Sequence, residues 1–186
     1  MYRNHNCGEL TSKNIGEQVT LAGWVQKIRN LGAMVFIDLR DQFGITQIVI
    51  SADNHTINKE ILNQIVTECV LQVVGKVVER SNKNPKMPTG EIEIEAQKIE
   101  ILGKCKNVLP FEINSEKAGE VKEDLRLEYR FLDLRNDKLH QTILLRSEIM
   151  KTLRKKMDEL GFTEIQTPIL ANSSPEGARD YLVPSR

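Results

Sequence analysis

The chain has 186 residues, of which 40% are hydrophobic and 28% charged, and its 26 basic residues balance its 26 acidic residues. This composition predicts a globular protein with one large core or two small ones, and the charge balance excludes nonspecific polyanion binding through a general basic excess. No apolar run approaches the roughly 20 residues that span a bilayer, and the polar start Met1–Asn6 does not look like a signal peptide, so we expect a cytoplasmic protein with no membrane partner.

The cysteines indicate neither a disulfide framework nor a metal site. Cys7, Cys69 and Cys105 are odd in number, far apart and free of any Cys-x-x-Cys spacing. We therefore expect three reduced thiols and no metal ligands.

The first half of the chain shows the period-two alternation of β-strands, interrupted by one helical segment. The expected strands are Gln18–Arg29, Ala33–Asp41, Ile45–Ser51, Cys69–Arg80 and Glu91–Leu102. The expected helix, His55–Val66, lies between the third and fourth strands. Three strands, a helix and two strands is the order of an OB-fold, an all-β five-stranded Greek-key barrel that commonly binds oligonucleotides. We expect this domain to cover residues 1–105.

Residues beyond the barrel change in character. Ser81–Gly90 is expected to form a long loop between the last two strands, and residues 106–136 a hinge or linker. A second domain should begin with a helix at Asp137–Leu160, which ends where Gly161 adopts the left-handed conformation. A strand, Phe162–Pro168, is expected to follow and to stop at its proline.

Alternation along Ala33–Asp41 divides its side chains between two faces. Val35, Ile37 and Leu39 share one face, and Phe36 falls on the other among polar residues. Phe36 is either a stacking platform for an unpaired base, worth about 1–3 kcal/mol, or is covered by a neighbouring element.

Other polar side chains on the expected strands are candidates for the same binding face. Lys27 and Arg29 are two residues apart and could reach phosphates or base edges, or could be ordinary solvated charges. Gln47 carries a donor and an acceptor, which suit it to reading a base edge. Glu91 and Glu93 alternate with apolar residues on the last strand, and one of them could accept from a base amino group.

The charged loop near the end of the chain has two interpretations. Glu176, Arg179 and Asp180 lie close together beside Gly177, which allows close approach to a ligand. The loop could close over a zwitterion, or it could be a solvated surface loop.

A series of short motifs follows in a fixed order along the chain: Cys7-Gly8, Val19–Val25, Phe36–Asp41, Gly90–Glu93, Tyr129–Arg135, Phe162–Leu170 and Pro175–Arg186. In this order the motifs resemble those of the bacterial-type aspartyl-tRNA synthetases, which are class II aminoacyl-tRNA synthetases. The resemblance covers essentially every residue.

The resemblance implies an OB-fold that binds the tRNA anticodon, a hinge, and the beginning of an α+β catalytic domain over residues 137–186. It implies that Phe36 stacks on the middle anticodon base and that Gln47 contacts a base edge. Further anticodon contacts are implied for Lys27, Arg29, Leu31, Asn82, Asn84, Glu91 and Glu93. At Lys27 the family favours arginine, whose two-pronged contact lysine cannot copy. Leu31 resembles the residue of enzymes that charge only the aspartate tRNA.

In the second domain the family resemblance implies two sites. The helix and the strand ending at Pro168 resemble class II motif 1, which forms the homodimer interface. The final loop resembles the one that closes over aspartate, with Glu176 holding the substrate ammonium. The other residues implied in that loop are Ser174, Gly177, Arg179 and Asp180.

The implied reaction activates L-aspartate with ATP and Mg²⁺ and transfers it to the aspartate tRNA. The two later class II motifs are expected beyond Arg186, so no complete catalytic set is expected in these residues. The favoured hypothesis is therefore part of an aspartate–tRNA ligase that recognises the anticodon but does not aminoacylate alone. The alternatives are a free-standing OB-fold RNA-binding module and a related synthetase for asparagine or lysine.

Overall fold

The computed structural model of the chain describes residues 2–51, 57–105, 108–114, 121–169 and 184. The chain divides into two compact units, Met1–Asn136 and Asp137–Arg186. Each unit is described by itself.

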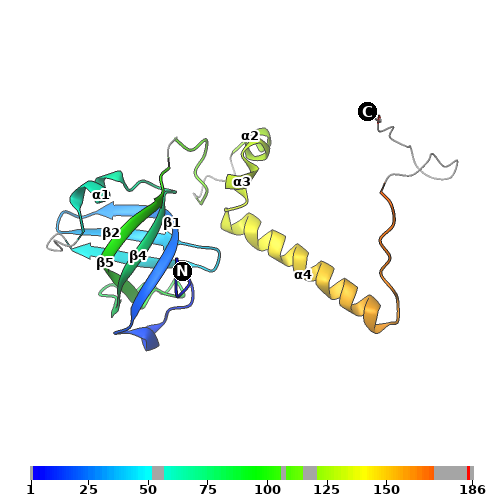
Figure 1. Cartoon of the computed structure of the whole chain (residues 1–186), viewed down its shortest axis with the longest axis horizontal. Helices are drawn as coiled ribbons and strands as arrows, with labels where there is room; N and C mark the ends of the chain where they lie inside the picture. Colours follow the sequence, from blue (N-terminus) through cyan, green and yellow to red (C-terminus); the bar gives the residue numbers. More distant parts are fainter. Residues whose placement is uncertain (1, 52–56, 106–107, 115–120, 170–183, 185–186) are drawn as a thin grey trace. The chain divides into compact units, whose positions relative to one another are not determined.

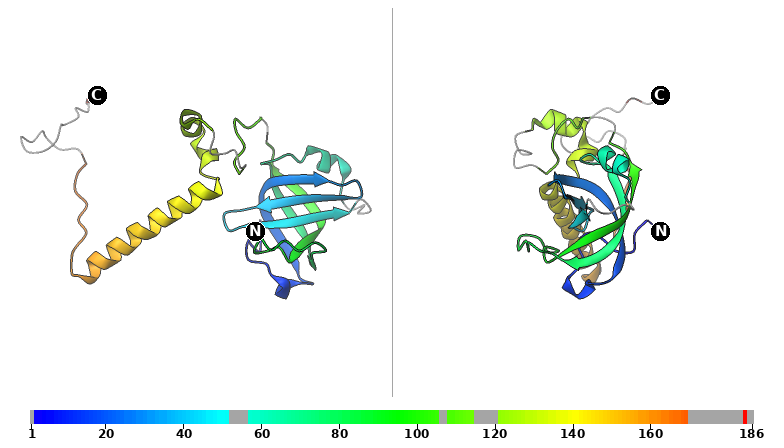
Figure 2. Two further views of the ribbon diagram at one scale, coloured as in Figure 1. Left: turned by 180° about the vertical axis from the view of Figure 1, so that it is seen from behind. Right: turned by 90° about the vertical axis from the view of Figure 1, so that its left-hand side faces the viewer.

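The first unit is built on a closed five-stranded barrel, which confirms the predicted OB-fold (Figure 1). Its strands are β1 (Gln18–Asn30), β2 (Met34–Arg40), β3 (Ile45–Ser51), β4 (Val70–Glu79) and β5 (Ile92–Gly103). They pair in the order β1-β2-β3-β5-β4, and all pairs are antiparallel except the short parallel contact of β3 with β5. Helix α1 (Lys59–Gln64) lies between β3 and β4 in the chain and is shorter than predicted. The strands curve around a common interior in both views of Figure 2.

Alternating apolar side chains fill the barrel. Ile37 and Leu39 are buried, as the alternation along β2 predicts. The same core takes residues from every strand, including Val19, Leu21, Val25, Ile48, Leu71, Val73, Ile92 and Ile94. The apolar face of α1 closes part of this core, because Ile61 and Leu62 pack against it.

A β-bulge in β1 decides which way its basic residues point. The pairing of β1 with β2 shifts between Val25 and Lys27, so Gln26 is an extra residue. Before the shift Val25 is buried, and after it Lys27 pairs with Asp38 and Arg29 with Phe36. Strict alternation from Val19 would have turned Lys27 and Arg29 inward, whereas the bulge places both on the outer face.

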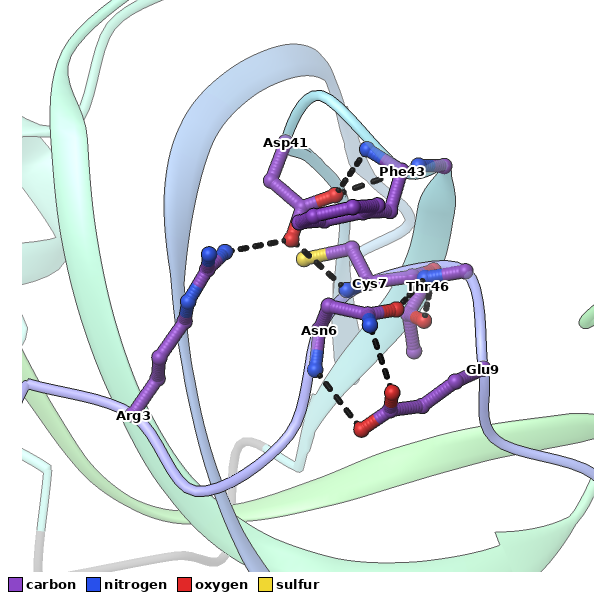
Figure 3. A network of polar contacts seen from close by, with 9 residues as sticks. Arg3, Asn6, Cys7, Glu9, Asp41, Phe43 and Thr46 are labelled. Atoms are coloured by element: carbon purple, nitrogen blue, oxygen red, sulfur yellow. Dashed lines mark hydrogen bonds and ion pairs between the residues drawn. The ribbon is translucent and has the colours of Figure 1, made fainter. Parts of the chain in front are cut away.

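The N-terminal segment is attached to the turn between β2 and β3 through Asp41 (Figure 3). One carboxylate oxygen of Asp41 accepts from Arg3 Nη1 at 2.7 Å and from the Cys7 amide at 2.9 Å. Its other oxygen accepts from the amides of Phe43 at 2.8 Å and Gly44 at 3.1 Å. Burial raises the pKa of the Cys7 thiol, and the carboxylate of Asp41 raises it further, so this cysteine stays protonated.

We expect Asp41→Ala to destabilise the barrel by about 2–3 kcal/mol, because three backbone amides lose their acceptor and Arg3 loses its ion pair. Chemical denaturation monitored by circular dichroism measures this change. Glu9→Ala is the control, since its bonds to Asn6 are exposed and local. Equal stability of the two variants would show that Asp41 does not hold the segment.

Two short helices lie within residues 106–136, the stretch expected to be a hinge or linker. They are α2 (Glu123–Glu128) and α3 (Arg130–Asp133). Asp133 is buried and accepts from Arg126 and Arg130, which ties the two helices together. After these helices, the guanidinium carbon of Arg135 lies 4.8 Å from the ring centre of Trp24 on β1, and its Nη1 lies 3.4 Å from Glu68 Oε2.

The second unit contains the long helix α4 (Asp137–Glu159), as predicted. Gly161 follows it with φ +83°, the left-handed conformation that its position predicts. The predicted strand at Phe162–Pro168 is wrong, because these residues form no strand in the structure. A strand requires a neighbouring ladder, and the described residues provide none for this segment. No helix within the described ranges is long and apolar enough to cross a membrane.

Candidate nucleic-acid interface

A groove of about 560 Å³ lies on the outer face of the barrel. Its walls come from all five strands and from the chain just after β4. It brings together six of the predicted binding residues: Arg29, Leu31, Phe36, Gln47, Asn82 and Glu93. These residues span 65 positions of sequence, and the barrel topology is what places them side by side.

Phe36 supplies an apolar floor to this groove. Its side chain is half-buried and lies between Arg29 on β1 and Val49 on β3 in the strand register. Leu31, 72% exposed, and Met34 add apolar surface at the groove edge. An aromatic ring in an open groove offers a face for stacking a base, which is the first of the two interpretations left open for Phe36.

A chain of hydrogen bonds crosses four strands beside Phe36. Arg29 Nη2 donates to Asp38 Oδ1 at 2.7 Å and to Gln47 Oε1 at 3.1 Å. Gln47 Nε2 in turn donates to Glu93 Oε2 at 2.7 Å. These bonds fix the orientation of the Gln47 amide, and both Gln47 and Glu93 are more than 90% buried. An amide and a carboxylate each have further donor or acceptor positions with which to meet a base edge.

Asp38 is the anion that holds the basic residues of this face. Burial raises its pKa, while Arg29, Arg80 and Lys27, in that order, lower it. The carboxyl is thus a partly desolvated counter-ion, and Arg29 is its nearest cation.

Arg80 lines the groove and was not among the predicted binding residues. Its Nε and Nη1 are buried and have no hydrogen-bond partner in the described part of the chain, and the same holds for Nε of Arg29. Buried donors without acceptors are costly, which indicates that an acceptor group belongs nearby. The sequence signal was its position as the last residue of the strand predicted at Cys69–Arg80, directly before the long loop.

The loop after β4 is held in shape by its own hydrogen bonds. The Asn84 amide donates to Gly90 O at 3.0 Å, and the Gly90 amide donates to Met87 O at 3.0 Å. Asn84 Oδ1 accepts from the Lys86 amide, and Thr89 Oγ1 donates to Ile45 O. Asn84 therefore organises the loop and does not line the groove, whereas Asn82 does.

We expect Gly90→Ala to disorganise this loop, because a Cβ at residue 90 would lie 1.8 Å from Asn84 O. Affinity for a bound RNA should fall about tenfold, since Asn82 and Arg80 would lose their fixed positions. Titration of a fluorescent stem-loop RNA measures the loss. Gly103→Ala is the control, because a Cβ at residue 103 would meet only the side chain of Val70, at 3.5 Å or more. Gly32→Ala is unsuitable, because Gly32 has a φ of +78°, which strains any other residue. Unchanged RNA affinity in Gly90→Ala would contradict a role for the loop.

The remaining predicted residues lie elsewhere. Lys27 lines a second cavity on the barrel, and Glu91 is exposed just before β5. Pro168 is exposed in the second unit. Ser174, Glu176, Gly177, Arg179 and Asp180 lie outside the described residues. Within the described ranges, no group of three or more His, Cys, Asp or Glu residues could hold a metal ion.

Two family models match the chain, one for each part. Residues 19–102 match the OB-fold nucleic acid binding domain, and residues 122–186 match the class II tRNA synthetases for D, K and N. Among solved structures, the chain is similar to the aspartyl-tRNA synthetase from Entamoeba histolytica (TM-score 0.77, 26% identity, 87% of this chain and 38% of that one). It is also similar to the asparaginyl-tRNA synthetase from Pyrococcus horikoshii complexed with asparaginyl-adenylate (TM-score 0.78, 26% identity, 95% and 39%). Both matched parts of the chain are thus similar to class II tRNA synthetases.

Curated relatives narrow this class. The aspartate–tRNA ligase of Lactobacillus acidophilus is 52% identical over 184 residues, which are 99% of this chain and 30% of the relative. That of Streptomyces avermitilis is 51% identical (100% and 31%), and the aspartate–tRNA(Asp/Asn) ligase of Zymomonas mobilis is 50% identical (100% and 30%). The chain belongs to the aspartyl-tRNA synthetase family of class II and corresponds to its N-terminal portion. It spans about 30% of the length of these relatives.

Proposed function

We propose that this chain is the anticodon-reading part of an aspartate–tRNA ligase. The observation that carries the proposal is the groove that gathers Phe36, Arg29, Gln47 and Glu93 from four strands. A stacking ring beside a fixed set of donors and acceptors suits a single-stranded base better than a duplex, whose bases are already stacked. The whole-chain similarity to aspartate–tRNA ligases at about 50% identity favours this over an asparagine enzyme or a free-standing RNA module.

The groove residues take distinct roles in this proposal. Phe36 stacks on the middle anticodon base, and Gln47 and Glu93 offer donor and acceptor positions to base edges. Arg29 holds Gln47 in place, and the unpaired donors of Arg80 meet a phosphate or a base carbonyl. Leu31, exposed at the groove edge, is the residue through which the ligase restricts itself to the aspartate tRNA.

The remaining functions belong to the proposal for the whole ligase. Residues 1–105 form its anticodon-binding domain, 106–136 its hinge, and 137–186 the beginning of its catalytic domain, whose motif 1 supports a homodimer. Glu176 and its loop bind L-aspartate, and the ligase works with ATP and Mg²⁺ in the cytoplasm. The described residues offer no acidic cluster for Mg²⁺, so no step of the adenylation is assigned to them.

Selective binding tests the proposal. The chain is titrated with an anticodon stem-loop of the aspartate tRNA and with a stem-loop of identical stem whose triplet is replaced. We expect affinity for the aspartate triplet to be at least about tenfold higher, since each mismatched base contact costs about 1–3 kcal/mol. Equal affinity for the two RNAs would contradict anticodon reading and favour the loosely selective RNA module.

A further inference from the structure

A second cavity of about 780 Å³ lies on the first unit, between the outer face of the barrel and the segment 108–114. Gln26, Lys27, Asp38 and Arg40 contribute its barrel wall, and Phe111 contributes to the opposite one. The segment is held by a 2.7 Å bond from Asn136 Nδ2 to the carbonyl of Ile113, which is itself buried. This volume is large enough for a nucleotide or a ligand of similar size.

On the barrel wall of this cavity, one polar atom of Arg40 and one of Gln26 are buried without partners in the described part of the chain. Arg40 is 4% exposed; its Nη2 donates to both carboxylate oxygens of Glu68, at 2.9 and 3.1 Å, while its Nη1 has no acceptor. Gln26 Oε1 has no donor. The bulge of β1 is what places Gln26 here. One donor and one acceptor on the same wall match a ligand edge that offers an acceptor and a donor in return, as nucleobase edges do.

Two of the other lining residues, Phe111 and Lys27, add to this chemistry. Phe111 is half-buried and supplies an aromatic ring opposite the polar wall. Lys27 is exposed and supplies a cation for a phosphate. A ring, a donor and acceptor pair and a surface cation together favour a nucleotide over an apolar ligand or a peptide.

The cavity adjoins the anticodon groove through shared residues. Asp38 lines the cavity and accepts the hydrogen bond of Arg29, which lines the groove. Phe36, Asp38 and Arg40 follow one another at every second position of β2, on the same face of that strand. An RNA strand with one base on Phe36 can therefore continue along β2 into the cavity.

We propose that this cavity binds a fourth nucleotide, the one that flanks the anticodon triplet on one side. Its base lies against Phe111 with its edge toward Arg40 and Gln26, and Lys27 contacts its phosphate. This proposal rests on the proposed function, because it assumes that the triplet occupies the groove.

Abasic substitutions test the proposal. Stem-loops are prepared with an abasic nucleotide directly before or directly after the triplet, and their affinities are measured for the chain and for Phe111→Ala. We expect one of the two abasic loops to bind the unaltered chain about tenfold more weakly. Phe111→Ala should weaken the intact loop by a similar factor and that abasic loop no further. The idea is overturned if neither abasic loop binds more weakly, or if the two losses multiply.

Two further variants separate binding from structure. Gln26→Ala removes a buried atom without a partner, so it should weaken the intact loop while the melting temperature stays unchanged or rises. A lower melting temperature with unchanged RNA affinity would assign Gln26 a structural role and overturn its contact. Phe131→Ala is the matched control, because Phe131 is an exposed aromatic outside the cavity and its loss should leave affinity unchanged.

The experiment also distinguishes this proposal from the proposed function. If the triplet is not read, replacing the triplet leaves affinity unchanged for every variant. If only the fourth nucleotide is wrongly assigned, replacing the triplet still weakens binding and Phe111→Ala behaves as the unaltered chain.

Discussion

Phe36→Ala is expected to lower the affinity of the chain for the aspartate anticodon stem-loop by about 10- to 100-fold. The ring is half-buried in the groove, and loss of one base–aromatic stack costs about 1–3 kcal/mol. Fluorescence anisotropy titration at fixed salt measures the change. Fixed salt is needed because phosphate contacts make RNA affinity strongly dependent on ionic strength.

Phe43→Ala is the matched control for this variant. Phe43 is also an aromatic residue of the barrel and is 56% exposed, but it lies on the turn after β2, outside the groove. Its loss removes the Arg3 contact at 5.6 Å and should leave RNA affinity unchanged. If both variants bind the stem-loop equally well, Phe36 is not a stacking platform.

Arg29→Ala should lower both RNA affinity and stability, and the stability loss should depend on pH. Arg29 bridges Asp38 and Gln47, so its removal frees the Gln47 amide and leaves Asp38 without its nearest cation. Affinity for the stem-loop should fall about 10- to 100-fold. Because the Arg29 side chain is 38% exposed, solvent screens the pair, and the stability loss at pH 7 should be about 1 kcal/mol.

The sign of the pH dependence follows from Asp38. Burial raises its pKa in the folded state and Arg29 opposes that rise, so removing Arg29 raises the pKa further. A raised carboxyl pKa costs stability above the unfolded pKa and ceases to cost it as the group protonates. The difference in unfolding free energy between Arg29→Ala and the unaltered chain should therefore shrink as the pH falls through the raised pKa of Asp38 and the carboxyl becomes protonated. Urea unfolding at several pH values measures this difference.

A double variant separates the two effects of Arg29. The double variant Arg29→Ala with Asp38→Asn no longer carries the partly buried carboxylate of Asp38. Its stability at pH 7 should therefore recover relative to Arg29→Ala, while its RNA affinity stays low. Recovery of RNA affinity together with stability would show that Arg29 acts only through the fold. A pH-independent loss in the single variant would contradict the role assigned to Asp38.

The barrel could be predicted because its signal is local. The alternation of Ile37 and Leu39 with polar residues indicates a strand from its own sequence alone, without knowledge of the neighbouring strands. Five such segments, with one helix between the third and the fourth, give the chain order of an OB-fold. The bulge at Gln26 could not be predicted, because it depends on the pairing of β1 with β2. This bulge nevertheless places Arg29 and Lys27 on the outer face of the barrel, where Arg29 lines the groove and Lys27 lines the second cavity.

The site was predicted in part, for a similar reason. Phe36, Gln47 and Glu93 carry chemistry that is visible residue by residue, and the structure brings them together. Arg80 was missed because nothing local distinguishes it from other basic residues; its unpaired donors appear only in three dimensions. The segment Phe162–Pro168 shows the opposite case, since a strand pattern alone does not form a strand without a partner.

A double-mutant cycle between Phe36 and the middle anticodon base tests the central claim most directly. Affinities are measured for the chain and for Phe36→Ala, each with the intact stem-loop and with one whose middle anticodon nucleotide is abasic. If Phe36 stacks on that base, either change alone weakens binding by about tenfold or more, and the two together weaken it no further than one. Losses that multiply, or an abasic loop that binds as tightly as the intact one, would contradict anticodon reading by Phe36.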